Sequence, residues 1–261
     1  MPQIAAQALG CSPDQVTLRL GDTTLPQTGM TVGSSTTWSV GSAVNAAARG
    51  LAAKLASMVD GDGPQASSTV TLNGAELVVN NGPITTVSLA GVLARHGVGS
   101  VAAEAHWAPG ETEHSMHTFG AVFAEVAVDE LLCVPRVRRL VGIYSAGRIV
   151  NPLTARSQMT GGLIWGLGQA LLERSVIDTR LGRFVSKNLA GYLLPVSADV
   201  PEVDVAFVEE YDEHDGAIGA RGIGELGAVG VSAAIANAVH HATGLRVRDL
   251  PITPEALCPT T

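Results

Sequence analysis

One glutamate inside a glycine-rich turn has clear chemical potential. Glu225 lies in the sequence Gly-Ile-Gly-Glu-Leu-Gly (222–227), directly before an apolar segment. Glycines allow a ligand to approach the backbone closely, and a carboxylate held in such a place can act as a positioned base. We therefore predict that Glu225 is catalytic and that Gly224 lies against a cofactor. The alternative is a glutamate that only favours a helix N-terminus through the helix dipole.

The same stretch matches the spacing of the dinucleotide-binding fingerprint, Gly-x-Gly-x-x-Gly, and Asp249 follows at about the distance of the ribose-binding acid. That fingerprint needs a strand that leads into the turn. Here an acidic loop, residues 209–216, precedes the turn, and Glu225 would face a pyrophosphate. We therefore predict no nicotinamide dinucleotide site.

A Ser- and Thr-rich stretch before a long helical pattern is a candidate anion site. Backbone N–H groups at a helix N-terminus, together with hydroxyl donors, form a cradle for phosphate. The candidate residues are Gly33, Ser34, Ser35, Thr36 and Thr37. The stretch is not a P-loop, because no Gly-Lys-[Ser/Thr] sequence occurs in it. The alternative is a helix cap that binds no ligand.

Gln158 is the third candidate, in the first turns of a predicted helix that follows an Asn-Pro turn. Its amide can both donate and accept hydrogen bonds, although an exposed surface glutamine is the alternative. The same helix contains four glycines, which cost about 1 kcal/mol each relative to alanine. They indicate close helix packing or a ligand that lies along the helix.

Histidines do not form a recognisable metal site in the sequence. His114 and His117 form an HxxH pair, and His240 and His241 are adjacent, but no third ligand is placed by spacing. No Gly-x-Ser-x-Gly nucleophile motif occurs either. We predict no metal ligands from this chain.

Composition excludes several classes of protein. The 261 residues include 16 Lys+Arg and 24 Asp+Glu, for a net charge of −8, and only 4% are aromatic. Such a chain is a poor candidate for a nucleic-acid binder. Hydrophobic residues make up 46%, which is typical of a folded chain. No apolar run reaches the roughly 18 residues of a membrane span, and the N-terminus lacks the basic region of a signal peptide.

The three cysteines, Cys11, Cys133 and Cys258, lie far apart. A sparse, odd set predicts neither a disulfide framework nor a CxxC metal motif. We therefore expect a reducing compartment and a cytoplasmic protein, with the periplasm reached only by export with a partner.

Helices and strands are predicted in alternation, so the fold class is mixed α/β or α+β. Helical periodicity is found in residues 4–9, 42–59, 86–95, 154–173 and 228–242. Strand patterns are found in residues 16–20, 101–107, 120–128, 137–144 and 203–209. A hairpin is predicted near 72–79, with an Asn-Asn-Gly turn at 80–82, and the glycine-rich residues 60–64 end the second helix.

Taken together, these segments resemble the molybdopterin-binding large subunit of the xanthine dehydrogenase/aldehyde oxidase family, in particular the bacterial aldehyde-oxidase type that carries molybdopterin cytosine dinucleotide. The resemblance covers nearly the whole chain and is vaguest in residues 60–100. Its matching segments are residues 3–10, 33–37, 41–44, 117–126, 147–152, 158–173, 219–227 and 247–254.

The resemblance implies a role for each candidate. Glu225 matches the family's active-site base, in a reaction that takes its oxygen from water. Gln158 matches a glutamine that hydrogen-bonds the pterin–metal centre, and residues 33–37 match the loop that holds the phosphates of the pterin dinucleotide. The pterin dithiolene, rather than a side chain, would bind molybdenum.

The family subunit is much longer, so the resemblance implies that this chain is a C-terminal molybdopterin-binding domain (1–261), with sub-lobes 1–115 and 116–261. The N-terminal half of the subunit would be a partner, as would a 2Fe-2S subunit and an FAD subunit that accept electrons. The substrate would be an aldehyde or an N-heterocycle. An inactive fragment or an assembly partner is the alternative. Residues 129–133 depart from the family's hairpin turn, since Leu-Leu-Cys is poor turn chemistry, and Arg221 stands where lysine is common.

Overall fold

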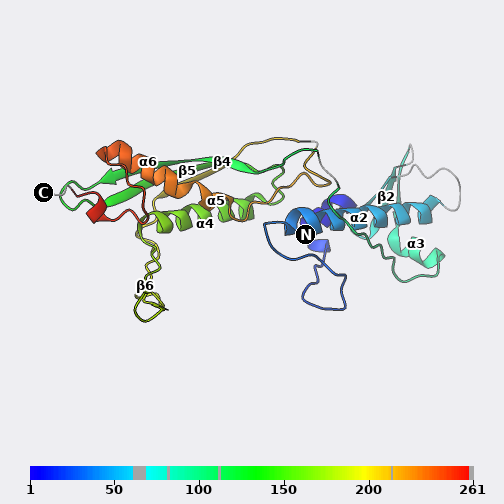
Figure 1. The fold of residues 1–261 in the computed structure, drawn as a ribbon. Coiled ribbons are helices and arrows are strands. Elements are labelled where there is room, and N and C mark those ends of the chain that lie inside the picture. Colours follow the sequence, from blue (N-terminus) through cyan, green and yellow to red (C-terminus); the bar gives the residue numbers. More distant parts are fainter. Residues whose placement is uncertain (61–68, 81–82, 111–112, 213, 259–261) are drawn as a thin grey trace. The chain divides into compact units, whose positions relative to one another are not determined.

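The computed structural model describes residues 1–60, 69–80, 83–110, 113–212 and 214–258 (Figure 1). The chain forms two compact units. Unit 1 contains Met1–Met116 and Asp212–Gly222, and unit 2 contains His117–Tyr211 and Ile223–Thr261. Helices and strands occur in both units, as the mixed α/β class predicts. The expected sub-lobes divide the chain once, after residue 115, whereas here a later segment, 212–222, belongs to unit 1.

Unit 1 packs one long helix against a small antiparallel sheet. Its core is formed by apolar side chains of that helix, of the strands and of the short helix α3, including Leu55, Leu77, Val79 and Val92. The sheet has the order β1-β2-β3. The elements are α1 (Pro2–Leu9), η1 (Pro13–Gln15), α2 (Thr36–Asp60), β1 (Thr69–Asn73), β2 (Glu76–Asn80), β3 (Ile84–Ser88) and α3 (Leu89–Arg95).

Helix α2 begins six residues earlier than the periodicity predicts. Serine hydroxyls bond back to the carbonyl one turn before, from Ser39 to Ser35 O at 2.8 Å and from Ser42 to Trp38 O at 2.5 Å. Such bonds allow serine inside a helix, where its propensity is otherwise modest. Two candidate residues that are expected before the helix, Thr36 and Thr37, are therefore the first residues of α2.

Two predicted strands of unit 1 are wrong. Residues 16–20 and 101–107 alternate in hydrophobicity, but neither segment is a strand, because neither finds a neighbour to pair with in the described residues. The second segment runs along α2 instead. There Lys54 Nζ donates to Ala102 O at 2.7 Å, and the Trp107 ring packs edge-on against Trp38.

The hairpin prediction for 72–79 is confirmed by the pairing of β1 with β2, whose connection is at Gly74, with a φ of +62°. Strand β2 also pairs antiparallel with β3, and Asn80 lies opposite Ile84, so a second connection follows Asn80, where the Asn-Asn-Gly turn is predicted. Residues 81–82 of the predicted Asn-Asn-Gly turn, and residues 61–64 of the predicted helix end, lie outside the described part of the chain. The predicted helix 86–95 begins at Leu89, after strand β3. Ser88 Oγ accepts from Gly91 N at 3.3 Å and so caps the helix.

Unit 2 places three helices alongside a mixed sheet of order β4-β5-β8 (Figure 1). Strands β4 and β5 are antiparallel, and β8 is parallel to β5. The core lies between the sheet and the helices and includes Leu140, Leu163, Leu167 and Ile235. The elements are β4 (Phe119–Val128), β5 (Pro135–Ser145), α4 (Pro152–Leu171), β6 (Ile177–Asp178), β7 (Arg183–Phe184), β8 (Glu202–Phe207), α5 (Leu226–Val229), α6 (Val231–Thr243) and η2 (Pro254–Ala256).

The predicted strands at 120–128, 137–144 and 203–209 and the predicted helix at 154–173 are confirmed within a few residues. The predicted helix 228–242 is interrupted at Gly230, which separates α5 from α6. Gly230 lies against Val122 of β4, and a Cβ there would meet the Val122 side chain at 3.2 Å.

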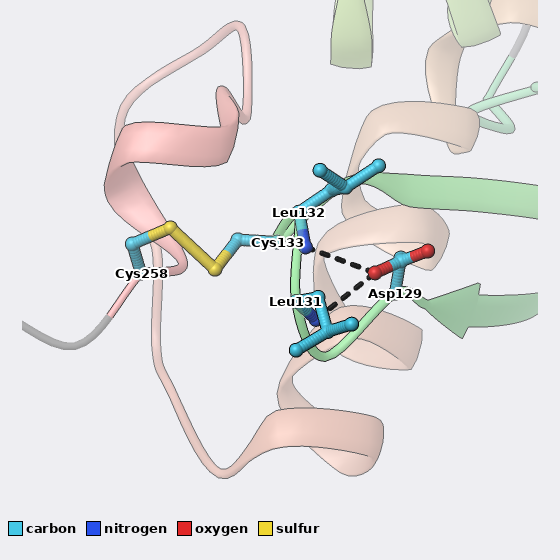
Figure 2. Close-up of a disulfide and its surroundings, with 5 residues drawn as sticks. All are labelled: Asp129, Leu131, Leu132, Cys133 and Cys258. Carbon is cyan, nitrogen blue, oxygen red and sulfur yellow. Dashed lines mark hydrogen bonds between the residues drawn. A yellow bond between two sulfur atoms is a disulfide. The ribbon is translucent and has the colours of Figure 1, made fainter.

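The β4–β5 connection forms a tight hairpin despite its Leu-Leu-Cys sequence (Figure 2). Asp129 Oδ1 accepts hydrogen bonds from Leu131 N and Leu132 N, both at 2.9 Å, and Cys133 N donates to Asp129 O at 2.8 Å. The Asp129 side chain stabilises the turn by accepting hydrogen bonds from the residues that follow it, so the turn forms without the usual glycine or proline. The doubt about this hairpin that the sequence raised is therefore removed.

The expectation that the cysteines stay unpaired is also wrong. Cys133 and Cys258 form a disulfide whose Cα atoms are 5.4 Å apart, and Cys11 is free. Figure 2 shows the bond between the hairpin and the C-terminal segment. A reducing compartment was expected because the cysteines seemed unpaired, so this ground for a cytoplasmic location no longer holds, and the location stays a prediction.

No helix in the described part of the chain combines the length and the apolar composition that a membrane span requires.

Replacing Asp129 with alanine removes the acceptor for two backbone N–H groups of the turn. We expect unit 2 to lose about 1–2 kcal/mol of stability, measured by denaturant unfolding of the full chain. Asp129→Asn keeps the side-chain oxygen and is the matched control. Equal losses in the two variants would contradict this role for the Asp129 carboxylate.

Candidate functional site

A pocket of about 390 Å³ in unit 2 contains the predicted base. One wall is the N-terminal half of α4 and the other is the turn that begins α5. The lining residues are Thr154, Ser157, Gln158, Gly161, Gly162, Trp165, Gly224, Glu225 and Ala228. The sequence identified Gln158, Gly224 and Glu225, and the structure brings these three together.

Gln158 joins the two walls. Its Nε2 donates to Gly224 O at 2.5 Å, between residues 66 positions apart in the sequence. This bond ties the turn that carries Glu225 to helix α4. An amide that uses one N–H in this way still has a second donor and an acceptor for a ligand.

Glycine-to-glycine contact fixes the distance between the walls. A Cβ on Gly162 would lie 2.7 Å from the carbonyl carbon of Gly227, and a Cβ on Gly227 would lie 2.8 Å from Met159 O. Both distances are too short for any side chain, so α4 and the turn touch backbone to backbone. Gly166 makes a similar close approach to the side chain of Val231.

Gly161 has a different role from its neighbour. A Cβ there would meet no atom within 4 Å, and Gly161 lines the pocket. The sequence left open whether the glycines of this helix serve packing or a ligand. Gly162 and Gly166 serve packing, whereas Gly161 leaves room beside the pocket.

Glu225 is not used as a helix cap. It is the residue before α5, a helix of only four residues, and its side chain makes no capping hydrogen bond. A helix that short has little dipole for a carboxylate to stabilise. The carboxylate is instead exposed at the pocket, where it can accept a proton from a bound ligand.

The 33–37 stretch lies in unit 1 and begins helix α2. Gly33 and Ser34 both have a left-handed backbone, with φ of +58° and +57°, and Ser35 Oγ donates to Val32 O at 2.7 Å. Ser34 contacts Gly222, where a Cβ would lie 2.9 Å from Ser34 O. The start of α2 and the end of the 212–222 segment therefore touch within unit 1.

Arg221 anchors that segment, and sequence reasoning missed its partners. Its Nε donates to Asp215 Oδ1 at 2.6 Å and its Nη2 to Asp212 Oδ2 at 3.1 Å. The Asp215 side chain is only 2% exposed. The acidic run before a lone arginine was the available signal. Two carboxylates compensate the guanidinium charge, so Arg221 holds the loop in place rather than offering a basic patch.

Two histidines lie side by side in unit 1. The rings of His114 and His214 lie 4.1 Å apart between centroids. No group of three His, Cys, Asp or Glu side chains suited to a metal ion occurs among the residues that the structure describes. Strand β8 ends at Phe207, so in that part of the chain no strand leads into the 222–227 turn, as a dinucleotide fingerprint would require.

The two adjacent glycines of α4 provide a matched test of this geometry. We expect Gly162→Ala to destabilise unit 2 by about 1–3 kcal/mol, because a methyl group there forces α4 away from the turn. Gly161→Ala should be neutral or stabilising by up to about 1 kcal/mol, because alanine favours a helix and the space is open. Denaturant unfolding of both variants measures the difference. Equal stabilities would show that the backbone contact is not needed.

Comparison with known proteins identifies the family of this chain. The aldehyde oxidoreductase molybdenum-binding subunit PaoC of Escherichia coli is 40% identical over 263 residues, which is 98% of this chain and 34% of that protein. The putative xanthine dehydrogenase molybdenum-binding subunit XdhA of Escherichia coli is 40% identical over 139 residues, which is 53% of this chain and 18% of that protein. The chain thus spans about a third of the length of PaoC.

Solved structures share the fold. Quinoline 2-oxidoreductase from Pseudomonas putida superposes with a TM-score of 0.80 at 24% identity, over 98% of this chain and 34% of that one. The aldehyde oxidoreductase from Desulfovibrio desulfuricans gives a TM-score of 0.74 at 24% identity, over 98% and 26% of the two chains. At these identities the likeness concerns the fold, which confirms the predicted mixed α/β class.

The family model that matches is the molybdopterin cofactor-binding domain, over residues 1–201. This match spans most of the chain and includes Gln158 and the 33–37 stretch. Together with the identity to PaoC, it shows that the chain belongs to the molybdopterin-binding domain of the xanthine dehydrogenase/aldehyde oxidoreductase large-subunit family and corresponds to a portion of that larger subunit.

Proposed function

We propose that this chain is the C-terminal, cofactor-binding portion of a molybdenum hydroxylase that oxidises an aldehyde or an N-heterocycle, with water as the oxygen source. The observation that carries the proposal is the pairing of Glu225 and Gln158 in one pocket, joined through Gly224. The similarity to the aldehyde oxidoreductase subunit PaoC favours an aldehyde.

The residues of the pocket fit a pterin-bound metal. Gly161 leaves open space on one wall, and Thr154, Ser157 and Gln158 supply hydroxyl and amide groups for a polar ring system. A metal held by the pterin needs no Cys or His ligand from the protein. When bound, the molybdenum cofactor supplies the two-electron redox centre.

The residues of the chain perform the proton chemistry and the positioning. The Glu225 carboxylate accepts a proton at one of its oxygens while the substrate is oxidised, as a general base does. Gln158 orients that carboxylate indirectly, since its bond to Gly224 O holds the adjacent residue. Gln158 would thereby contact the cofactor and, through its bond to Gly224, hold the base in position.

We propose molybdopterin cytosine dinucleotide as the form of the cofactor, with its diphosphate at Gly33, Ser34, Ser35, Thr36 and Thr37. The left-handed turn at Gly33 and Ser34 leads into the 25-residue helix α2, and such helix N-termini favour anions. Backbone and hydroxyl groups would hold the diphosphate, because the charge of Arg221 is already compensated by Asp212 and Asp215.

We propose that the rest of the large subunit covers an apolar arm of unit 2. The arm comprises residues 173–201, which include the small β6–β7 hairpin and extend away from the sheet in Figure 1. The arm exposes more large apolar side chains than a protein surface in contact with water usually does. Those exposed by more than half include Ile177, Leu181, Phe184, Val185, Leu189 and Leu193.

A 2Fe-2S subunit and an FAD subunit would accept the electrons.

A second candidate is a non-catalytic fragment or assembly partner of the same family. It is favoured by the exposure of Glu225 and Gln158 to solvent. The two candidates differ in whether the chain, combined with the rest of a large subunit and the electron-accepting subunits, binds cofactor and turns over.

Glu225→Gln tests the catalytic assignment in such a reconstituted complex. We expect dye reduction by aromatic aldehydes to fall by about 10²–10⁴-fold, because glutamine cannot accept the proton. Molybdenum and cytidine nucleotide content should stay at the level of the unaltered complex. Normal turnover by the variant would overturn the mechanism, whereas loss of cofactor would reassign Glu225 to binding.

The chain by itself should be inactive, and it should retain molybdenum in less than stoichiometric amounts. Its pocket is open and its apolar arm is uncovered, so one portion cannot enclose the cofactor. Metal analysis and dye-reduction assays on the isolated chain measure this. Turnover by the isolated chain would contradict the need for a covering partner, and an inactive but fully loaded complex would favour the assembly-partner candidate.

A further inference from the structure

We propose that Cys133 and Cys258 form a redox-controlled lock that holds the C-terminal segment 252–258 on the core of unit 2. Oxidation fixes the segment, and reduction releases it. The inference concerns the stability of unit 2 and does not depend on the proposed function.

The hairpin end of the lock has an unusual backbone. Cys133 has a φ of +56°, in the left-handed region that favours glycine or asparagine. The residue before it, Leu132, and Leu131 are largely exposed, whereas Cys133 is 5% exposed and lies in the core cluster (Figure 2). A cysteine in a position better suited to glycine indicates that its sulfur is needed there.

The other end of the lock has few attachments besides the disulfide. Between the end of α6 and residue 258, the last described residue, the only regular element is the three-residue turn η2. Among the described residues, one backbone hydrogen bond joins the segment 252–258 to the helix layer, from Ile252 N to Ala170 O at 2.7 Å, and two of the segment's side chains, Ile252 and Leu257, are buried. These side chains lie against Leu163, Leu167 and Ile235 in the core.

The position of the cross-link gives it a large effect. It joins residues 125 positions apart and so encloses β5, α4, β8 and α6 in one covalent loop. Closing a long loop removes conformational entropy from the unfolded chain, which raises the stability of the folded state. Without the bond, the segment depends on its two apolar side chains and its few backbone bonds.

The lock is accessible to redox chemistry from one side. Cys133 is buried, but Cys258 is exposed, so a thiol reagent can attack there. In the oxidation, two S–H bonds break and one S–S bond forms. Two electrons and two protons pass to a low-molecular-weight disulfide such as oxidised glutathione, which is reduced to two thiols.

Peptide mapping tests the pairing without any need for refolding. The full chain is incubated with oxidised glutathione, blocked with a thiol reagent in denaturant and digested with trypsin. We expect one cross-linked pair, residues 96–136 with 249–261, and a blocked Cys11 in residues 1–19. Three blocked cysteines, or a cross-link that contains Cys11, would overturn the proposal.

Hydrogen exchange and thermal unfolding test the lock itself. Adding a reductant should abolish the slow exchange of the Ile252, Leu257 and Cys258 amides and lower the Tm of unit 2 by about 5–15 °C. Cys11→Ser should keep this response. Cys133→Ser and Cys258→Ser should lack it and behave like the reduced chain in both conditions.

The variant Cys133→Gly distinguishes the effect of the disulfide from the effect of the left-handed backbone at residue 133. Glycine relieves the left-handed backbone but removes the sulfur, so this variant should be at least as stable as the reduced parent chain and should not respond to reductant. A parent chain whose exchange and Tm are unchanged by reductant would overturn the lock, even if the disulfide is present in the peptide map.

Discussion

The site depends on a backbone-to-backbone contact between α4 and the turn that begins α5. Gly162 and Gly227 meet at a distance that excludes any side chain. Because the contact is made by main-chain atoms, it sets the separation of the two walls with little freedom. Gln158 then adds a directional hydrogen bond to Gly224. Glu225, the proposed base, follows in the next position, so its location is a consequence of how closely two pieces of backbone can approach.

The core of unit 2 keeps α4 in the place that this contact requires. Leu163 and Leu167 alternate along the helix with Gly162 and Gly166, so one helix carries both the close approach and the apolar packing. The C-terminal segment covers the same core and is linked covalently to the β4–β5 hairpin. The turn that Asp129 organises is thus joined covalently to a segment that packs in the same core as the helix that lines the pocket.

Long periodic segments could be predicted from the sequence, and short isolated ones could not. The helix at 154–173 and the strands at 120–128 and 137–144 were recognisable because their own hydrophobic pattern specifies a buried face. Residues 16–20 and 101–107 also carry a strand pattern, but neither segment pairs with a strand in the part of the chain that the structure describes. A strand is completed by hydrogen bonds to a neighbour, and a pattern within one segment says nothing about whether that neighbour exists.

The sequence by itself determined the chemical types at the pocket: a carboxylate among glycines at Glu225 and an amide at Gln158, both in the order that the family resemblance requires. Only the tertiary structure decided which glycine of α4 touches the backbone of the α5 turn and which faces open space, that Gln158 binds Gly224, and that Cys133 meets Cys258. The physical reason is separation along the chain. Contacts between residues 66 or 125 positions apart are set by the packing of whole helices and strands, so they cannot be predicted from the spacing of residues that are close in the sequence.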